Sequence, residues 1–309
     1  MNAPKGRILD GLQAGTLAHD YAQFLQREDP LERWKDVVAH AEDIACSVDP
    51  GRYAMPKDLV DRLSGKVPGI RDLLANVEFA DHAARRLGLR YAYLRFQQHA
   101  LMLEATERLA ADIRFPLGTF IEAGCFTGGF LHFLARRHPK ARAIGIDVSP
   151  VALDVASDMA RRMRLGRRMH WLEVDFLLAG RQGIESAIGT GMGRPVVFLC
   201  NMISTLGHRF ADVPAVAPWQ IEAGLISYWV RQGAMVILCE RHDHPDLLLE
   251  TLVHAGEWKG LNAGVSVLAR QHLPTTMQMT RENLVGKWFN AMTCVLAFHG
   301  GDGCSEAWM

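Results

Sequence analysis

The spacing of hydrophobic and polar residues changes near Pro116, and this change divides the chain into two parts. Before Pro116, three segments repeat apolar residues at the spacing of an amphipathic helix. These segments are residues 30–48, 73–89 and 90–113. In the longest, Leu101 lies on the apolar face, whereas Gln98 and His99 lie on the opposite face. Such a stripe needs a surface to cover, so residues 1–115 are predicted to form an all-helical cap. The cap is either simply packed or closes a site on the second part.

After Pro116, short apolar runs alternate with helical patterns. The runs typical of strands are residues 119–125, 141–148, 168–176, 196–201, 234–240, 264–273 and 294–299. The helical segments are residues 130–138, 150–163, 219–233 and 245–256. Ser149 is a favoured N-cap residue, and Pro150 is favoured at the first helical position. Apolar strands that alternate with helices predict an α/β fold over residues 116–309, with a mostly parallel sheet covered on both faces.

Composition and charge are those of an ordinary globular protein and argue against a nucleic-acid partner. Of the 309 residues, 49% are hydrophobic and 22% are charged. Lys and Arg together number 34, as do Asp and Glu, so no basic excess marks a nucleic-acid binder. The basic run from Arg161 to Arg168 is interpreted as the cation-rich end of a helix, where positive charge complements the helix dipole.

The cysteines and the termini favour a cytoplasmic protein. The six cysteines form no C-x-x-C pair, which is typical of reduced thiols. The first residues lack the apolar core of a signal peptide. No apolar run reaches the roughly 18 residues that a membrane span needs, so no membrane partner is expected.

A glycine-rich turn follows the first strand of the second part, in the string Glu122-Ala-Gly124-Cys-Phe126-Thr-Gly128. In an open parallel sheet, ligands bind beyond the carboxyl ends of the strands, so this turn belongs to the predicted site. A dinucleotide fingerprint would need glycine where Phe126 stands, and the Glu122 carboxylate repels a diphosphate. A Walker sequence is absent as well. The turn therefore predicts a ligand with hydroxyl or ammonium groups near Glu122 and no phosphate.

Two further acids follow the next two strands. Asp147 ends the second strand, where its carboxylate can accept hydrogen bonds from both hydroxyls of a ribose. Asp175 ends the third strand, where it can accept a hydrogen bond from an adenine amino group, and Phe176 can pack on the base. Three acids at three successive strand ends are more specific than any one of them, although such acids can also simply cap helices.

In these motifs the chain resembles the class I S-adenosylmethionine (SAM) dependent methyltransferases, whose first motif is acid-x-G-x-G-x-G. The chain departs at the middle glycine, Phe126, where the catechol and caffeoyl-CoA type O-methyltransferases look similar. The resemblance covers residues 116 to 300 and implies a Rossmann-like methyltransferase sheet with SAM as cosubstrate. The cofactor-binding residues that it implies are Glu122, Gly124, Phe126, Thr127, Gly128, Asp147, Val148, Asp175, Phe176 and Asn201. Phe126 is either a hydrophobic plug under the turn or a cation–π partner of the sulfonium.

Groups for the acceptor are expected at the ends of the fourth and fifth strands and on the cap. The candidates are Tyr91, Tyr93, Ser204, Arg241 and His242. The two tyrosines either hydrogen-bond the acceptor or fill a domain interface. The fourth strand ends without the acids of metal-dependent O-methyltransferases, and His242-x-His244 has no evident third ligand, so no metal is expected.

The sequence therefore predicts a SAM-dependent methyltransferase that acts on a small-molecule acceptor. An alternative is an enzyme in which the methionine chain of SAM is attacked, giving aminocarboxypropyl transfer or an azetidine ring and releasing methylthioadenosine. The motifs report cofactor binding, and they do not say which carbon faces the nucleophile. A catalytically silent SAM-binding subunit is a further alternative. The oligomeric state is left open by the sequence.

Overall fold

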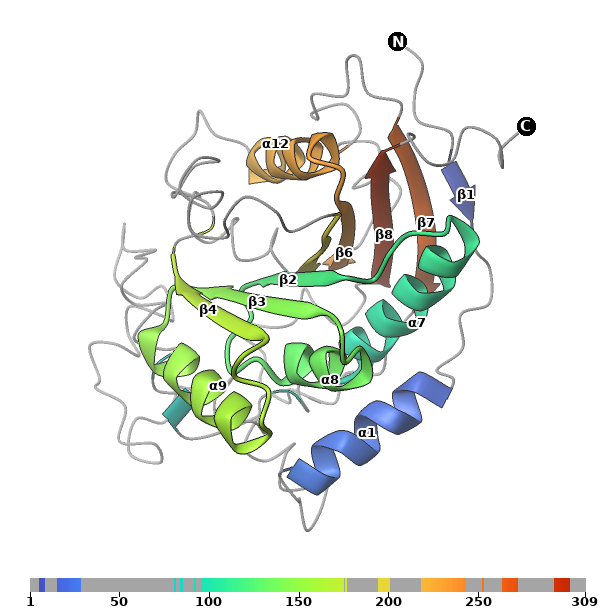
Figure 1. The fold of residues 1–309 in the computed structure, drawn as a ribbon. Helices are drawn as coiled ribbons and strands as arrows, with labels where there is room; N and C mark the ends of the chain where they lie inside the picture. Colours follow the sequence, from blue (N-terminus) through green and yellow to red (C-terminus); the bar gives the residue numbers. More distant parts are fainter. Residues whose placement is uncertain are drawn as a thin grey trace, which may run out of the picture.

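In the part of the chain that the structure describes, eight strands form one sheet in the order β1-β7-β8-β6-β5-β2-β3-β4 (Figure 1). The computed structural model describes residues 6–8, 16–28, 81, 84–85, 92, 96–174, 176, 194–200, 218–242, 252, 263–271 and 292–300. The strands are β1 (Gly6–Ile8), β2 (Thr119–Ala123), β3 (Arg142–Asp147), β4 (Met169–Glu173), β5 (Val196–Cys200), β6 (Met235–His242), β7 (Ala263–Gln271) and β8 (Met292–Gly300).

The strand order reverses direction beside β2. The chain runs from β2 outward through β3 to β4, and then returns to the other side of β2 with β5 and β6. These strands are parallel, whereas β8 is antiparallel to both β6 and β7. In open α/β sheets, ligands bind outside the carboxyl ends of the strands where the order reverses. The topology therefore predicts a ligand site at the carboxyl ends of β2 and β5.

Each central strand contributes alternate residues to two cores, one on each face of the sheet. Phe120 of β2 lies in the core beneath α1 (Thr16–Glu28), α7 (Phe96–Asp112), α8 (Gly129–Arg137) and α9 (Pro150–Arg162). Its neighbour Ile121 lies in the core beneath α12 (Pro218–Arg231) on the other face. Figure 1 shows α12 apart from the other four helices. This alternation requires strands that are apolar on both faces, so the predicted fold class, a mostly parallel Rossmann-like sheet with helices on both faces, is confirmed.

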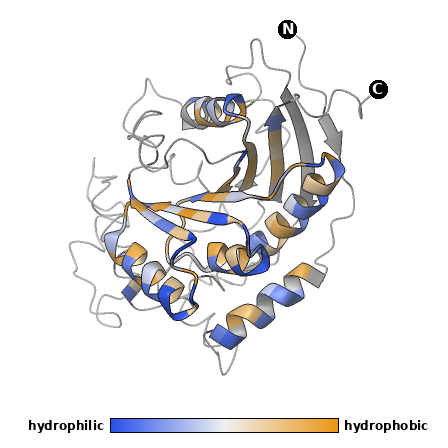
Figure 2. Cartoon of the chain, viewed as in Figure 1, coloured by the Kyte–Doolittle hydropathy of each residue, from blue (hydrophilic) through white to orange (hydrophobic). Residues whose placement is uncertain are grey.

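The helices that cover the sheet are amphipathic. In Figure 2, α1, α7 and α9 carry both hydrophilic and hydrophobic residues along their length. Helix α1 docks through Tyr21 and Phe24, whose rings lie 5.1 and 5.5 Å from the ring of Phe133 in α8. Burial of each such ring contributes about 1.5–3 kcal/mol. This aromatic contact holds α1 against α8, the helix that follows the glycine-rich turn.

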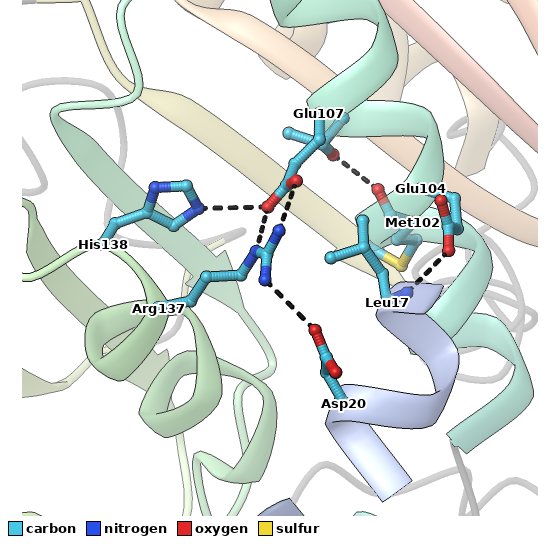
Figure 3. Close-up of polar contacts among 8 residues, drawn as sticks. Leu17, Asp20, Met102, Glu104, Glu107, Arg137 and His138 are labelled. Atoms are coloured by element: carbon cyan, nitrogen blue, oxygen red, sulfur yellow. Dashed lines mark hydrogen bonds and ion pairs between the residues drawn. The ribbon is translucent and has the colours of Figure 1, made fainter. Parts of the chain in front are cut away.

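An ionic network joins α1, α7 and α8 (Figure 3). Arg137 of α8 forms a bidentate ion pair with Glu107 of α7, with 2.9 Å between Nη2 and Oε2, and also reaches Asp20 of α1. Burial raises the pKa of Glu107, but hydrogen bonds from His138 and Arg137 outweigh it and lower the pKa to about 2. Glu107 therefore stays ionised and holds α7 against α8.

The predicted start of α9 is confirmed. Ser149 is the N-cap residue, and its Oγ accepts a hydrogen bond from the amide of Ala152 at 3.0 Å. Pro150 occupies the first turn, where its missing N–H costs nothing. Gly233 follows α12 with φ of 81°, as its predicted place at the end of that helix requires.

Three local features differ from the sequence analysis. Strand β1 pairs with β7 at the edge of the sheet, and neither it nor α1 was expected. Gln98 and His99, predicted on the polar face of their helix, are buried. The division at Pro116 stays a prediction, because most residues before 96 lie outside the described part of the chain. Within that part, β1 pairs with β7, and α1 and α7 contribute residues to the core on one face of the sheet.

None of the helices that the structure describes is long and apolar enough to cross a membrane.

Candidate active site

The glycine-rich turn is fixed by hydrogen bonds to the neighbouring strand. The amides of Gly124 and Cys125 both donate to the carbonyl oxygen of Ile146 in β3, at 2.8 and 3.1 Å. The amide of Gly128 closes the turn by donating to the carbonyl oxygen of Cys125 at 2.9 Å. Gly124 and Gly128 have φ of 70° and 69°, in the left-handed region that glycine adopts without strain. The turn is therefore rigid and joined to the end of β3.

Phe126 has the backbone conformation of the glycine that it replaces. Its φ is 49°, so this residue keeps the left-handed turn although its side chain disfavours it. The left-handed conformation costs a residue with a Cβ about 1–2 kcal/mol. Its amide donates to Oδ2 of Asp147 at 2.8 Å, a charge-assisted bond that offsets part of this cost.

Gly128 and Gly145 make room for Trp171 of β4. A Cβ on Gly128 would lie 2.5 Å from the Trp171 ring. A Cβ on Gly145 of β3 would meet the same ring and would lie 2.7 Å from Sγ of Cys125. Gly128 was expected to contact the ligand, whereas no role in the site was expected for Gly145. The one signal for Gly145 is its place inside a buried strand, which often marks a close approach of another group.

Glu122 is a buried carboxyl group with an unused acceptor. It is 3% exposed, and its Oε2 has no hydrogen-bond partner among the described residues. It pairs in register with Gly145 on one side and Phe198 of β5 on the other, so it stands where the strand order reverses. Burial raises its pKa well above the ordinary value, and the nearby Cys200 and Asp147 raise it further. A buried carboxyl group of this kind is suited to a cationic ligand.

Asp147 links the turn to the start of α9. Besides the bond from the amide of Phe126, its Oδ1 accepts a hydrogen bond from the amide of Ser149 at 2.9 Å. Burial raises its pKa, although these backbone hydrogen bonds act in the opposite direction. A carboxylate offers about four lone-pair sites, so Asp147 keeps acceptor capacity beside its backbone donors. Asp147 is 8% exposed, which leaves an edge of the group toward solvent.

Two groups from the N-terminal part reach this edge of the sheet. The hydroxyl of Ser149 donates to Oδ1 of Asp81 at 2.5 Å. His99 of α7 places its Nε2 3.9 Å from Oε1 of Glu122, an ion pair if the imidazole is protonated. Sequence analysis gave neither residue a role. A signal for His99 was available, because residues 100–103 are all apolar and predict a helix buried on all sides at that point.

The structure also describes Thr127, Val148 and Phe176 among the expected cofactor-binding residues. Thr127 is buried in the turn, and Val148 is half-buried directly after β3. The ring of Phe176 is stacked on Trp229 of α12, with 6.4 Å between centroids and planes 3° apart. Phe176 thus belongs to the core beneath α12, and its contact with adenine stays a prediction.

Several candidates lie outside the described residues: Asp175, Asn201, Ser204, Tyr91 and Tyr93. Strand β6 runs through His242, with Arg241 paired to Thr293 and His242 to Met292 of β8. These are the last two residues of β6, which runs two residues beyond the predicted end of the fifth strand, and their side chains lie outside what the structure describes. Among the described residues, no three His, Cys, Asp or Glu side chains lie together as a metal site would require.

No protein-family model and no curated protein sequence matches the chain significantly. Among solved structures, the chain is similar to a SAM-dependent methyltransferase from Clostridium acetobutylicum, with 10% identity and a TM-score of 0.42 over 68% of this chain and 97% of that one. It is also similar to a geranyl diphosphate C-methyltransferase from Streptomyces coelicolor A3(2), with 12% identity and a TM-score of 0.38 over 68% and 80%. A third is the [4+2]-cyclase SpnF, with 15% identity and a TM-score of 0.38 over 66% and 83%. Because these identities and TM-scores are low, the fold is assigned from the strand order of this chain and the function from its own residues.

Proposed function

We propose that the chain is a SAM-dependent methyltransferase that transfers the sulfonium methyl group to a small-molecule acceptor. The observation that carries this proposal is Glu122, a buried carboxyl group with an unpartnered oxygen at the point where the strand order reverses. It stands two residues before Gly124, in a turn whose backbone keeps the left-handed conformation at all three glycine positions of the motif.

The donors of the amino acid part and the ribose of SAM fit the acceptors at this edge. An ammonium group offers three N–H donors and a positive charge, which suit the unpartnered Oε2 of Glu122. The two ribose hydroxyls suit the remaining lone pairs of Asp147. A phosphate would instead meet two buried carboxyl groups, which supports a nucleoside without phosphate.

SAM supplies the electrophilic methyl group and its leaving group, so the chain has to bind, orient and exclude water. Glu122 receives the ammonium group of the cofactor, and Asp147 receives its ribose hydroxyls. Phe126 lies between these two residues in the sequence, within the rigid turn. Phe126 is the candidate for a cation–π contact with the sulfonium, worth about 0.5–2 kcal/mol. Thr127, Val148, Asp175, Phe176 and Asn201 remain candidates for the rest of the cofactor.

A small-molecule acceptor is supported by the neutral charge balance, since a nucleic acid is usually bound by a basic surface. The groups proposed to contact it are Tyr91, Tyr93, Ser204, Arg241 and His242.

Product analysis tests the proposed reaction. The purified protein is incubated with SAM, with and without extract of its host, and the adenosyl product is identified by mass spectrometry. S-adenosylhomocysteine that appears only with extract is expected for methyl transfer. Methylthioadenosine, formed without an added acceptor, would overturn methyl transfer and favour attack on the methionine chain.

A binding measurement tests the cofactor site independently of the acceptor. S-adenosylhomocysteine at 100 times its Kd should stabilise the protein by about 2.7 kcal/mol. Glu122→Gln should lose most of this stabilisation. Glu173→Gln is the matched control, because Glu173 is an exposed carboxylate at the carboxyl end of β4. No stabilisation of the wild-type protein would remove the SAM assignment.

A further inference from the structure

A series of three buried polar side chains, those of Tyr21, His99 and Glu122, connects α1 to β2. The hydroxyl oxygen of Tyr21 in α1 lies 3.0 Å from Nδ1 of His99 in α7, and both residues are buried. The other ring nitrogen of His99, Nε2, lies 3.9 Å from Oε1 of Glu122 in β2. The three residues are 78 and 23 positions apart in sequence, so only the packing of α1 and α7 on the sheet brings them together.

Aromatic packing holds the rings of Tyr21 and His99 in this series. The His99 ring lies 4.7 Å from the ring of Phe130, the second residue of α8, with 31° between their planes. Tyr21 packs edge-on to the same Phe130 at 6.3 Å and against Phe133 at 5.1 Å. Both rings therefore pack against α8, which begins at the glycine-rich turn.

The tautomer of His99 sets the direction of its hydrogen bond with Tyr21. A neutral imidazole has one donor and one acceptor nitrogen, so the tautomer in which the Tyr21 hydroxyl donates to Nδ1 carries the ring proton on Nε2. That N–H then faces Oε1 of Glu122, and Oε2 is left for a ligand. At 3.9 Å the contact is electrostatic, and a short movement of either side chain would make it a hydrogen bond.

The groups around Glu122 affect the ionisation of its carboxyl group. Asp147 of β3 and Cys200 of β5 both oppose ionisation of Glu122. His99 places Nε2 3.9 Å from Oε1 of Glu122, where an N–H on that nitrogen would favour the carboxylate. Three polar groups in an otherwise apolar core are costly unless they serve one another or a ligand.

We propose that Tyr21 and His99 are positioning residues, through which α1 and α7 orient the Glu122 carboxylate that receives the ammonium group of the cofactor. This inference rests on the proposed function, because it assigns the ammonium group to Glu122. The N-terminal helices would then complete the cofactor site as well as cover the sheet.

The test compares two nucleosides that differ in the amino acid part. S-adenosylhomocysteine carries the ammonium group, whereas methylthioadenosine lacks the whole amino acid part. Their Kd values are measured by calorimetry for the wild type, Tyr21→Phe, His99→Leu and Glu122→Gln. Tyr228→Phe is the matched control, since it removes a buried tyrosine hydroxyl beneath the other face of the sheet.

Tyr21→Phe and His99→Leu are each expected to weaken the binding of S-adenosylhomocysteine about tenfold, because each removes the buried hydrogen bond that orients the His99 ring beside Glu122. Methylthioadenosine should bind unchanged, and Tyr21→Phe should add no further loss to Glu122→Gln. Equal weakening of both nucleosides would reduce Tyr21 and His99 to a structural role and overturn the inference. Should His99→Leu fail to fold, Tyr21→Phe decides, because it removes one oxygen only.

The inference and the proposed function fail in different ways. If the wild type binds neither nucleoside, both are wrong. If S-adenosylhomocysteine binds the wild type and is lost in Glu122→Gln, but Tyr21→Phe and His99→Leu bind it normally, the proposed function stands and the inference falls.

Discussion

At the scale of single residues, the candidate site combines groups that a stable fold would avoid. Glu122 is a carboxyl group buried among Asp147 and Cys200, and Phe126 holds a left-handed backbone. Both lower the stability of the free protein, and both lie at the edge where the topology puts a ligand. At Glu122, stability and binding should therefore respond to a substitution in opposite directions.

Glu122→Gln should stabilise the free protein and weaken the cofactor. Gln keeps the shape of the side chain and removes the carboxyl group whose pKa burial raises. A higher unfolding free energy at pH 8 is expected from urea denaturation, with at least a tenfold weaker Kd for S-adenosylhomocysteine. A loss of stability together with unchanged affinity would show that Glu122 serves the fold alone.

Replacement of Phe126 separates its backbone strain from its side-chain burial. Phe126→Ala loses the buried ring and keeps the left-handed strain, whereas Phe126→Gly loses the ring and relieves the strain. Both should destabilise, because a lost Phe side chain costs about 3–5 kcal/mol and the strain only about 1–2 kcal/mol. The Gly variant should nevertheless be the more stable by about 0.5–1 kcal/mol in thermal or urea unfolding. The reverse order would contradict a left-handed Phe126.

At the scale of helices and strands, the basic run after α9 provides a cap for α8. Nη1 of Arg168 donates to the carbonyl oxygens of Ala135, His138 and Ala141, at 2.7, 3.2 and 3.3 Å. These carbonyl groups lie at and just after the C-terminal end of α8, where positive charge also complements the helix dipole. The run was expected to complement the end of its own helix, and Arg161 and Arg162 do stand in the last turn of α9, whereas Arg168 caps the preceding helix.

Arg168→Met should therefore destabilise the protein by about 1–2 kcal/mol, since methionine keeps most of the apolar stem and removes the donors. Arg167→Met is the control, because Arg167 is an exposed neighbour in the same basic run. Urea unfolding of both variants checks the difference. Equal stability of the two variants would mean that water replaces the Arg168 bonds without loss.

The sheet was predictable element by element, whereas the N-terminal contributions to the site were not. Strands such as β2 and β5 are apolar on both faces, and that pattern survives any arrangement of the covering helices. Strand β1 has three residues and no pattern of its own, and its place depends on β7. The burial of His99 depends on Tyr21 and Glu122, which are distant in sequence, so the helical period alone assigned it to the polar face.

At the scale of the whole molecule, two buried ionisable groups make the stability of the fold depend on pH in opposite directions. Burial lowers the pKa of His132 from 6.5 to about 4, although its Nε2 lies 2.9 Å from the carbonyl oxygen of Ala156. Between these values the unfolded chain binds a proton that the folded chain does not, so this contribution falls as pH falls. The raised pKa of Glu122 acts oppositely, because the folded chain then binds the extra proton above pH 4.5 and stability falls as pH rises.

The His132 contribution can be isolated by comparing variants across pH. Over the window from 6.5 down to about 4, it amounts to a loss on the order of 3 kcal/mol in the wild type. His132→Gln removes the titrating group, so its unfolding free energy, measured in urea from pH 7.5 to 4, should fall less steeply than that of the wild type. The exposed His170→Gln of β4 is the control and should follow the wild-type slope. Because the Glu122 contribution has the opposite sign, Glu122→Gln should instead steepen the fall toward low pH. Parallel curves for all four proteins would show that neither buried group governs the acid stability of this fold.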